Sequence, residues 1–158
     1  MFKLVQGRTN IISMTIREAT IEDIPQIQIV RNSVNENMLS DPGLITDEAC
    51  KIFITQRGKG WVCEIENKIV GFAIADLQEN NIWALFVHPD FEKQGIGRQL
   101  QRMMLEWYFS NNKKDVWLST TPNTRAEIFY RKSGWTETGL YNEKEIKFVM
   151  TSEKYFNS

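Results

Sequence analysis

The sequence has few of the residues that build metal centres and disulfide-stabilised folds. Histidine occurs once, as His88, and cysteine twice, as Cys50 and Cys63. A single histidine excludes the usual multi-histidine metal sites, and two distant cysteines form neither a CxxC pair nor a disulfide framework. We therefore expect no metal and two buried free thiols, which is typical of a cytoplasmic protein.

Long apolar runs and an excess of one charge are also missing. The run IWALFV is far shorter than a membrane span, and residues 1–13 lack the apolar stretch and cleavage site of a secretory signal. Lys and Arg together number 19 against 20 for Asp and Glu, which gives a formal net charge of −1. This balance predicts neither a nucleic acid nor a membrane as partner.

The composition is that of one folded domain. The chain has 158 residues, of which 42% are hydrophobic and 25% charged, enough apolar surface for a single core. A regular pattern of strands and helices begins at Met14, which is a candidate start of the chain proper. We expect residues 1–13 to be a flexible N-terminal extension and residues 14–158 to be a single domain.

Hydrophobic periodicity and turn residues predict a mixed α/β fold. Thr20 and Asp23 have the spacing of a capping box at the start of a helix, and Gly134 is placed to end one. The expected strands are 15–19, 61–66, 69–77, 81–87, 115–121, 135–140 and 145–150. The expected helices are 20–38, 46–56, one that starts after Gly95, and 123–133. The predicted order is β–α–α–β–β–β–α–β–α–β–β.

Two glycines at the start of a helix need an explanation. In HPDFEKQGIGRQL, Gly95 and Gly97 follow a strand and open a helix, although glycine costs a helix about 0.5–1 kcal/mol relative to alanine. A helix N-terminus presents free N–H groups, and glycine lets an anion approach them closely. The dinucleotide fingerprint GxGxxG does not fit, because Leu100 takes its third glycine position. The turn therefore indicates a phosphate site of another kind.

The stretches VHPDFEKQGIGRQL and NTRAEIFYRKSGW together resemble the two central motifs of the GNAT superfamily of N-acetyltransferases. The first resembles the [Q/R]xxGxG/A turn and the second the NxxAxxFYxxxGF segment, over a resemblance that spans about residues 14–151. The resemblance implies a GNAT-like, largely antiparallel central sheet flanked by helices. It also implies an acyltransferase that uses acetyl-coenzyme A as co-substrate and no metal.

The resemblance also implies roles for individual residues. Tyr130 would donate a hydrogen bond or proton to the coenzyme A sulfur, and the backbone N–H of Val87 would stabilise the oxyanion. Without the motif, Tyr130 is a core aromatic and Asn123 a plain helix cap. The implied coenzyme-binding residues are Leu85, Phe86, Val87, Lys93, Gln94, Gly95, Ile96, Gly97, Arg98, Asn123, Phe129 and Tyr130.

The chain departs from the family pattern at two positions. Glu92 stands where Gln or Arg is usual, and Trp83 stands where many members carry a glutamate as general base. The base is therefore unassigned: Glu36, Asp41 and His88 are candidates, with Glu36 as the working choice. Its alternative is a solvated carboxylate at a helix end. Trp83 is expected to shape the acceptor pocket or to pack in the core.

The sequence does not decide among three functions. The leading one is transfer of acetyl from acetyl-coenzyme A to a primary amine of a small molecule or peptide. The second is the same chemistry with another acyl donor or a hydroxyl acceptor. The third is a binding or sensing module for acyl-coenzyme A without turnover. Many members of the superfamily pair into homodimers, so a homodimer is one assembly that the resemblance implies.

Overall fold

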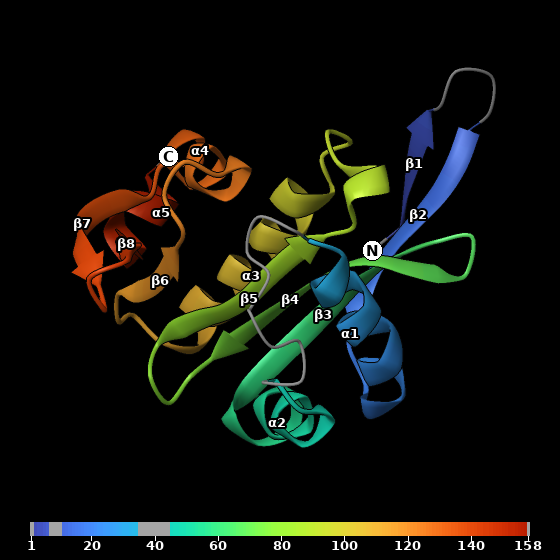
Figure 1. Cartoon of the computed structure of the whole chain (residues 1–158), viewed down its shortest axis with the longest axis horizontal. Helices are drawn as coiled ribbons and strands as arrows, with labels where there is room; N and C mark the ends of the chain where they lie inside the picture. The colour runs from blue at the N-terminus through green and yellow to red at the C-terminus, as the bar shows by residue number, and fades with distance from the viewer. Residues whose placement is uncertain (1, 7–10, 35–44, 158) are drawn as a thin grey trace.

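The computed structural model describes residues 2–6, 11–34 and 45–157. These residues form a twisted sheet with helices on both faces (Figure 1). The strands are β1 (Phe2–Gln6), β2 (Ile11–Glu18), β3 (Gly58–Ile65), β4 (Lys68–Asp76), β5 (Asn81–Val87), β6 (Val116–Thr120), β7 (Thr136–Tyr141) and β8 (Glu145–Met150). The helices are α1 (Ile24–Ser33), α2 (Asp47–Ile52), α3 (Ile96–Asn111), α4 (Arg125–Lys132) and α5 (Ser152–Phe156). The expected order of elements is confirmed, with β1 and α5 as additions.

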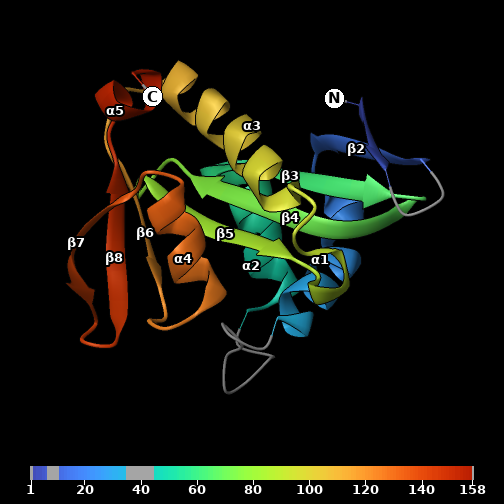
Figure 2. The same ribbon diagram turned by 90° about the horizontal axis from the view of Figure 1, so that it is seen from above.

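The sheet has the strand order β1-β2-β3-β4-β5-β6-β8-β7 and is antiparallel except between β5 and β6. Figure 2 shows α3 on one side of β3–β5 and α1 and α2 on the other. This arrangement confirms the predicted mixed, largely antiparallel sheet flanked by helices.

One strand lies within the expected N-terminal extension. Residues 2–6 form β1, which pairs antiparallel with β2 from Phe2 opposite Thr15 to Gln6 opposite Ile11. The backbone of β1 thereby bonds to an edge of β2 that would otherwise present unpaired N–H and C=O groups. Part of the expected extension is therefore a strand, and β2 begins earlier than the strand that the sequence predicts.

The start of α1 follows the predicted capping box. The backbone N–H of Thr20 donates to Asp23 Oδ2 at 2.8 Å, and the N–H of Asp23 donates to the carbonyl of Thr20. A short 3₁₀ turn over Ile21–Asp23 then leads into the helix, which ends at Ser33. The remaining residues of the expected helix, 35–38, lie outside the described part of the chain.

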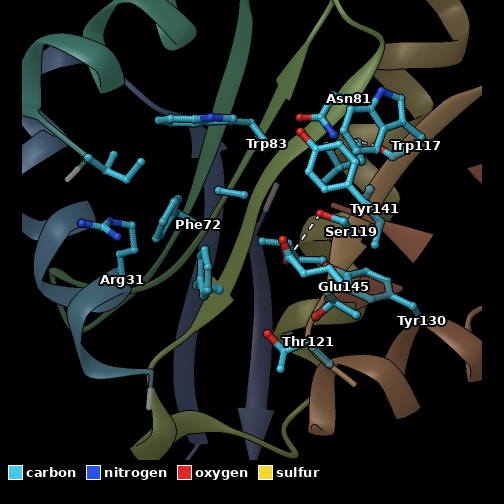
Figure 3. A pocket seen from close by; sticks show the side chains of 18 of the residues that line it. Arg31, Phe72, Asn81, Trp83, Trp117, Ser119, Thr121, Tyr130, Tyr141 and Glu145 are labelled. Carbon is cyan, nitrogen blue, oxygen red and sulfur yellow. Dashed lines mark hydrogen bonds between the residues drawn. The ribbon is translucent and has the colours of Figure 1, made fainter. Parts of the chain in front are cut away.

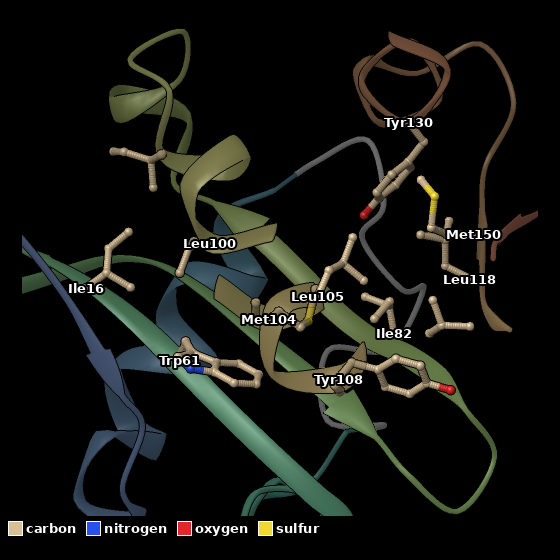
Figure 4. Close-up of a cluster of buried hydrophobic side chains, with 14 of the residues drawn as sticks. Ile16, Trp61, Ile82, Leu100, Met104, Leu105, Tyr108, Leu118, Tyr130 and Met150 are labelled. Carbon is tan, nitrogen blue, oxygen red and sulfur yellow. The ribbon is translucent and has the colours of Figure 1, made fainter. Parts of the chain in front are cut away.

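Two clusters of buried side chains hold the helices on the sheet. One lies beneath α3 and α4 and includes Leu100, Met104 and Tyr108 of α3, all fully buried (Figure 4). The other lies beneath α1 and α2 and includes Ile27 and Cys50. Cys50 and Cys63 are buried free thiols, as expected.

Candidate active site

Strands β5 and β6 separate from each other directly after they meet. Their register contains one pair, Asn81 opposite Trp117, although both strands continue for several residues. The side-chain amide of Asn81 donates to the Trp117 carbonyl at 3.0 Å and fixes this junction. Beyond it the two strands diverge (Figure 1), so one edge of β5 is left without a neighbouring strand.

The open edge of β5 presents specific backbone groups. The N–H of His88 donates to the carbonyl of Val70 at 2.8 Å, so His88 and Val70 form a hydrogen-bonded pair. Such pairs alternate with non-bonded pairs along an antiparallel ladder, and Val87 opposite Gly71 is the next pair along. The N–H groups of Val87 and, two residues earlier, Leu85 therefore point away from β4, toward the gap.

The glycine turn lies beside this edge. Gly95 is the N-cap of α3 and has φ +82°, a left-handed conformation that glycine adopts most easily. A Cβ at Gly95 would meet no heavy atom within 4 Å, so the turn faces open space. The N–H of Gln99 donates to the carbonyl of Gly95, which leaves the preceding first-turn amides of the helix without intrahelical acceptors.

A cavity of about 550 Å³ lies between the start of α3 and α4, and we call it the α3–α4 cavity. It collects nearly all the residues that the sequence predicts to bind coenzyme A: Leu85, Phe86, Val87, Lys93, Gly95, Ile96, Gly97, Arg98, Phe129 and Tyr130. Gln94 and Asn123 are not among its lining residues. Glu92 and Arg125, which the sequence analysis did not assign to the site, do line it and form an ion pair.

Asn123 does not cap α4 in the way expected of it. The N-cap is Thr124, whose hydroxyl accepts a hydrogen bond from the N–H of Glu127. Asn123 has φ +62° and donates its backbone N–H to Glu127 Oε1 at 2.8 Å, which is the main cause of the lowered pKa of that carboxyl. A threonine and an asparagine are both good caps, and the sequence does not distinguish them.

A second cavity, of about 570 Å³, opens between β5 and β6 on the face covered by α1 and α2, and we call it the β5–β6 cavity. Figure 3 shows Trp83, Phe72 and Arg31 on one side of it and Trp117, Tyr141, Ser119 and Glu145 on the other. The two cavities share the residues Leu85, Phe86, Ala126 and Tyr130. They therefore meet at the open edge of β5.

Tyr130 lies at the point where the cavities meet. Its side chain comes from α4 and is only 7% exposed, and burial raises the pKa of its hydroxyl above the ordinary value of about 10. The hydroxyl has no hydrogen-bond partner among the described residues, and none of their buried side-chain oxygens lacks one. The hydroxyl therefore reaches the cavities as a neutral donor.

Trp83 occupies a bulge in β5. Ile74 of β4 lies opposite Ala84, and Ala75 lies opposite Ile82, so Trp83 is the extra residue between them. The bulge places Trp83 on the α1–α2 face, where its ring stacks on Phe53 with centroids 3.9 Å apart and planes 6° apart. Trp83 thus lines the β5–β6 cavity and also packs against the buried cluster beneath α1 and α2.

The structure places one candidate base outside both cavities and does not describe the other two. His88 lines neither cavity, and its Nδ1 accepts a hydrogen bond from the N–H of Asp90 at 3.1 Å. Glu36 and Asp41 lie outside the described residues. Glu145 is a carboxylate on the cavity wall that the sequence analysis missed, because only the register of β8 against β6 brings it there.

Two negative findings concern the described residues alone. None of their His, Cys, Asp and Glu side chains gather in groups of three or more that could hold a metal ion. None of their helices is long and apolar enough to cross a membrane.

Comparison with known proteins places the chain in a family. Residues 26–135, more than half of the chain, match the model of the "Acetyltransferase (GNAT) family". An uncharacterised N-acetyltransferase of Archaeoglobus fulgidus is 35% identical over 80 residues, which cover 44% of this chain and 54% of that protein. Human N-acetyltransferase 8 is 32% identical over 111 residues, 63% of this chain and 49% of that protein. The chain thus spans about half the length of the curated relatives it matches.

Solved structures share the fold at low sequence identity. The PaiA N-acetyltransferase of Thermoplasma acidophilum in complex with coenzyme A has a TM-score of 0.78 at 14% identity, over 87% of this chain and 98% of that one. A putative streptothricin acetyltransferase of Bacillus anthracis in complex with acetyl-coenzyme A has a TM-score of 0.68 at 20% identity, over 87% and 99%. The fold and the family model agree, and the chain belongs to the acetyltransferase (GNAT) family.

Proposed function

We propose that the protein transfers an acetyl group from acetyl-coenzyme A to a primary amine. One observation carries this proposal: the α3–α4 cavity and the β5–β6 cavity meet at Tyr130 and the open edge of β5. A two-substrate transfer needs two sites whose reacting ends touch. The family supports acetyl transfer in general, and the geometry supports direct attack by the acceptor.

The residues of the α3–α4 cavity fit coenzyme A. The first-turn amides of α3 suit the phosphates, and Lys93 and Arg98 add positive charge beside them. The outward N–H groups of Leu85 and Val87 suit the amide-rich arm of the coenzyme, which would lie along β5 much as an added strand does. Gly95 and Gly97 keep this approach free of side chains.

The reacting groups follow from this placement. Acetyl-coenzyme A supplies an activated acetyl thioester. Val87 would donate its backbone N–H to the carbonyl oxygen as negative charge develops there, an interaction typically worth about 10²–10³ in rate. Tyr130 would donate its hydroxyl to the sulfur as it leaves. Glu36 stays the working candidate for the base on sequence grounds.

Thiol release in the presence of a panel of amines tests the proposal, with mass spectrometry to identify the acetylated product. The expected result is thiol release that depends on an amine and matches the acetylated amine formed. Trp83 stands where many members of the family carry a glutamate as general base. This favours one alternative, a sensor that binds acetyl-coenzyme A without turnover. A rise in melting temperature with acetyl-coenzyme A, but no amine-dependent thiol release, would support that alternative and contradict ours.

A further inference from the structure

Glu145 places a carboxylate on the β6–β8 wall of the β5–β6 cavity. It is the first residue of β8, and its neighbour Ile146 is buried in the cluster beneath α3 and α4. Because side chains alternate along a strand, Glu145 points to the opposite face, into the cavity. Ser119 of β6 donates its hydroxyl to Glu145 Oε2 at 3.5 Å (Figure 3).

Among the described residues that line this cavity, Glu145 is the only acidic one. The family's usual carboxylate would come from β5, but Trp83 occupies that position. The negative charge of Glu145 therefore lies across the gap from β5, on the side that also holds Tyr130 and Ser119. An ammonium group that enters the cavity has one carboxylate to pair with within the described part of the wall.

The walls that face this carboxylate are aromatic. Trp83 stacks on Phe53, and Phe72 contacts Phe86 with ring centroids 5.6 Å apart. On the other side Trp117 contacts Tyr141 at 5.1 Å. Aromatic rings pack against apolar bodies, and Glu145 supplies the partner for a positive charge. The cavity therefore suits a substrate with an apolar, ring-containing body and one positive charge.

A second positive charge on the substrate would meet another cation. Lys144, in the turn before β8, lines the cavity. Like charges at close range are unfavourable, so a polyamine or a lysine-rich peptide would be disfavoured there. The charge pattern thus selects for a single ammonium group.

We propose that the acceptor is a primary monoamine on an aromatic body and that Glu145 binds its ammonium group in the β5–β6 cavity, opposite Trp83. This proposal rests on the proposed function and names its substrate class. Glu145 acts here as a binding residue that orients the nitrogen toward the junction at Tyr130. Its substitution should therefore weaken binding of a charged amine and spare binding of the same body without charge.

A comparison of phenethylamine, hexylamine and spermidine as acceptors tests the substrate class. We expect kcat/KM for phenethylamine to exceed that for spermidine by about tenfold or more, as one desolvated charge interaction allows. Thiol release that is fastest with spermidine, or equal for all three amines, would overturn this inference and leave the proposed function standing. No release with any amine would overturn both.

The variant Glu145→Gln tests the residue, with Glu143→Gln as the matched control. Glu143 lies in the turn just before β8, is exposed, and lines neither cavity. Glu145→Gln should raise KM for phenethylamine about tenfold or more. It should leave unchanged the inhibition constant of 2-phenylethanol, which has the same body without the charge. Glu143→Gln should alter KM by less than about twofold, as for exposed charges.

Two results would contradict the role of Glu145. Equal loss of phenethylamine and 2-phenylethanol binding would show that the substitution disturbs the cavity as a whole. An unchanged KM for phenethylamine, in a variant that still binds acetyl-coenzyme A and keeps its melting temperature, would show that the ammonium group binds elsewhere.

Discussion

Glu92, in the turn before α3, forms an ion pair with Arg125, the first residue of α4, and both side chains line the α3–α4 cavity. The family usually has Gln or Arg where this chain has Glu92. A bare carboxylate there would repel the phosphates of a coenzyme, and Arg125 offsets that charge. The pair also connects the two helix starts that frame the cavity.

Arg125→Ala should weaken coenzyme A binding about tenfold, because it removes a cation and leaves Glu92 unpaired near the phosphates. Titration calorimetry measures the change. Arg102→Ala is the matched control, since Arg102 is 75% exposed, pairs with Glu106 on α3 and lines neither cavity. Equal effects of the two substitutions would show that general charge, not this position, sets the affinity.

Gly95→Ala and Gly97→Ala should differ in their effect on the stability of the folded protein. Gly95 has φ +82°, so a side chain there should lower the free energy of unfolding by about 1–2 kcal/mol. A Cβ at Gly97 would lie 3.6 Å from the Phe129 ring, an ordinary contact, and alanine suits a helix better than glycine. Gly97→Ala should therefore keep or raise the melting temperature.

The same Gly97→Ala variant should bind coenzyme A more weakly, because its new methyl group narrows the α3–α4 cavity. Calorimetry on the folded variant checks this directly. Unchanged affinity in Gly97→Ala would mean that the ligand does not approach the start of α3 closely.

Tyr130→Phe should lower kcat and leave the affinity for acetyl-coenzyme A nearly unchanged, because the ring keeps its contacts and the hydroxyl alone is lost. The high pKa that burial gives Tyr130 keeps the hydroxyl protonated throughout the neutral range. Loss of this donor should therefore lower kcat by a similar factor at every pH from 6 to 9. Steady-state rates of the two proteins across that range measure it, and an unaltered kcat would remove the proposed role.

The free energy of unfolding should fall as the pH rises above about 9. Burial raises the pKa of Tyr108 to about 12 and that of Cys63 to about 12, and it raises the pKa of Tyr130 as well. In the unfolded chain these groups lose their protons near pH 8.5 for cysteine and about 10 for tyrosine. The folded state then holds more protons than the unfolded state, so stability decreases with pH in this window.

Urea unfolding at pH 8 and pH 10.5 measures this decrease. Tyr108→Phe should reduce this decrease in stability, because one of the three groups is removed. The variant also loses the hydrogen bond from Tyr108 to Asn80 Oδ1, but this loss is present at both pH values and does not alter the difference between them. A decrease of the same size in the variant would show that Tyr108 does not contribute to it.

Local signals in the sequence were sufficient for most of the fold. The capping box at Thr20, the helix end at Gly134 and the glycine turn at Gly95 each depend on neighbouring residues, and each occurs where predicted. Strand β1 was missed because its evidence lies in pairing with β2, which no pattern within residues 2–6 reveals. The same holds for α5, a helix of five residues whose Tyr155 ring packs on Phe109.

The lining of the α3–α4 cavity was predictable from the sequence, and that of the β5–β6 cavity was not. Leu85 to Val87 and the turn to Arg98 are contiguous in the sequence, so a motif captures them. The wall that holds Ser119 and Glu145 comes from β6 and β8, which are joined through α4 and β7, and depends on sheet register. Arg125 likewise meets Glu92 only in space.

The central claim is that the start of α3 binds the phosphates of coenzyme A, and calorimetric titration of coenzyme A and of pantetheine tests it most directly. Pantetheine keeps the thiol arm and lacks the phosphates. The account predicts clear binding of coenzyme A that weakens with salt, and much weaker binding of pantetheine. Equal affinities for the two ligands, or no heat with coenzyme A, would contradict it.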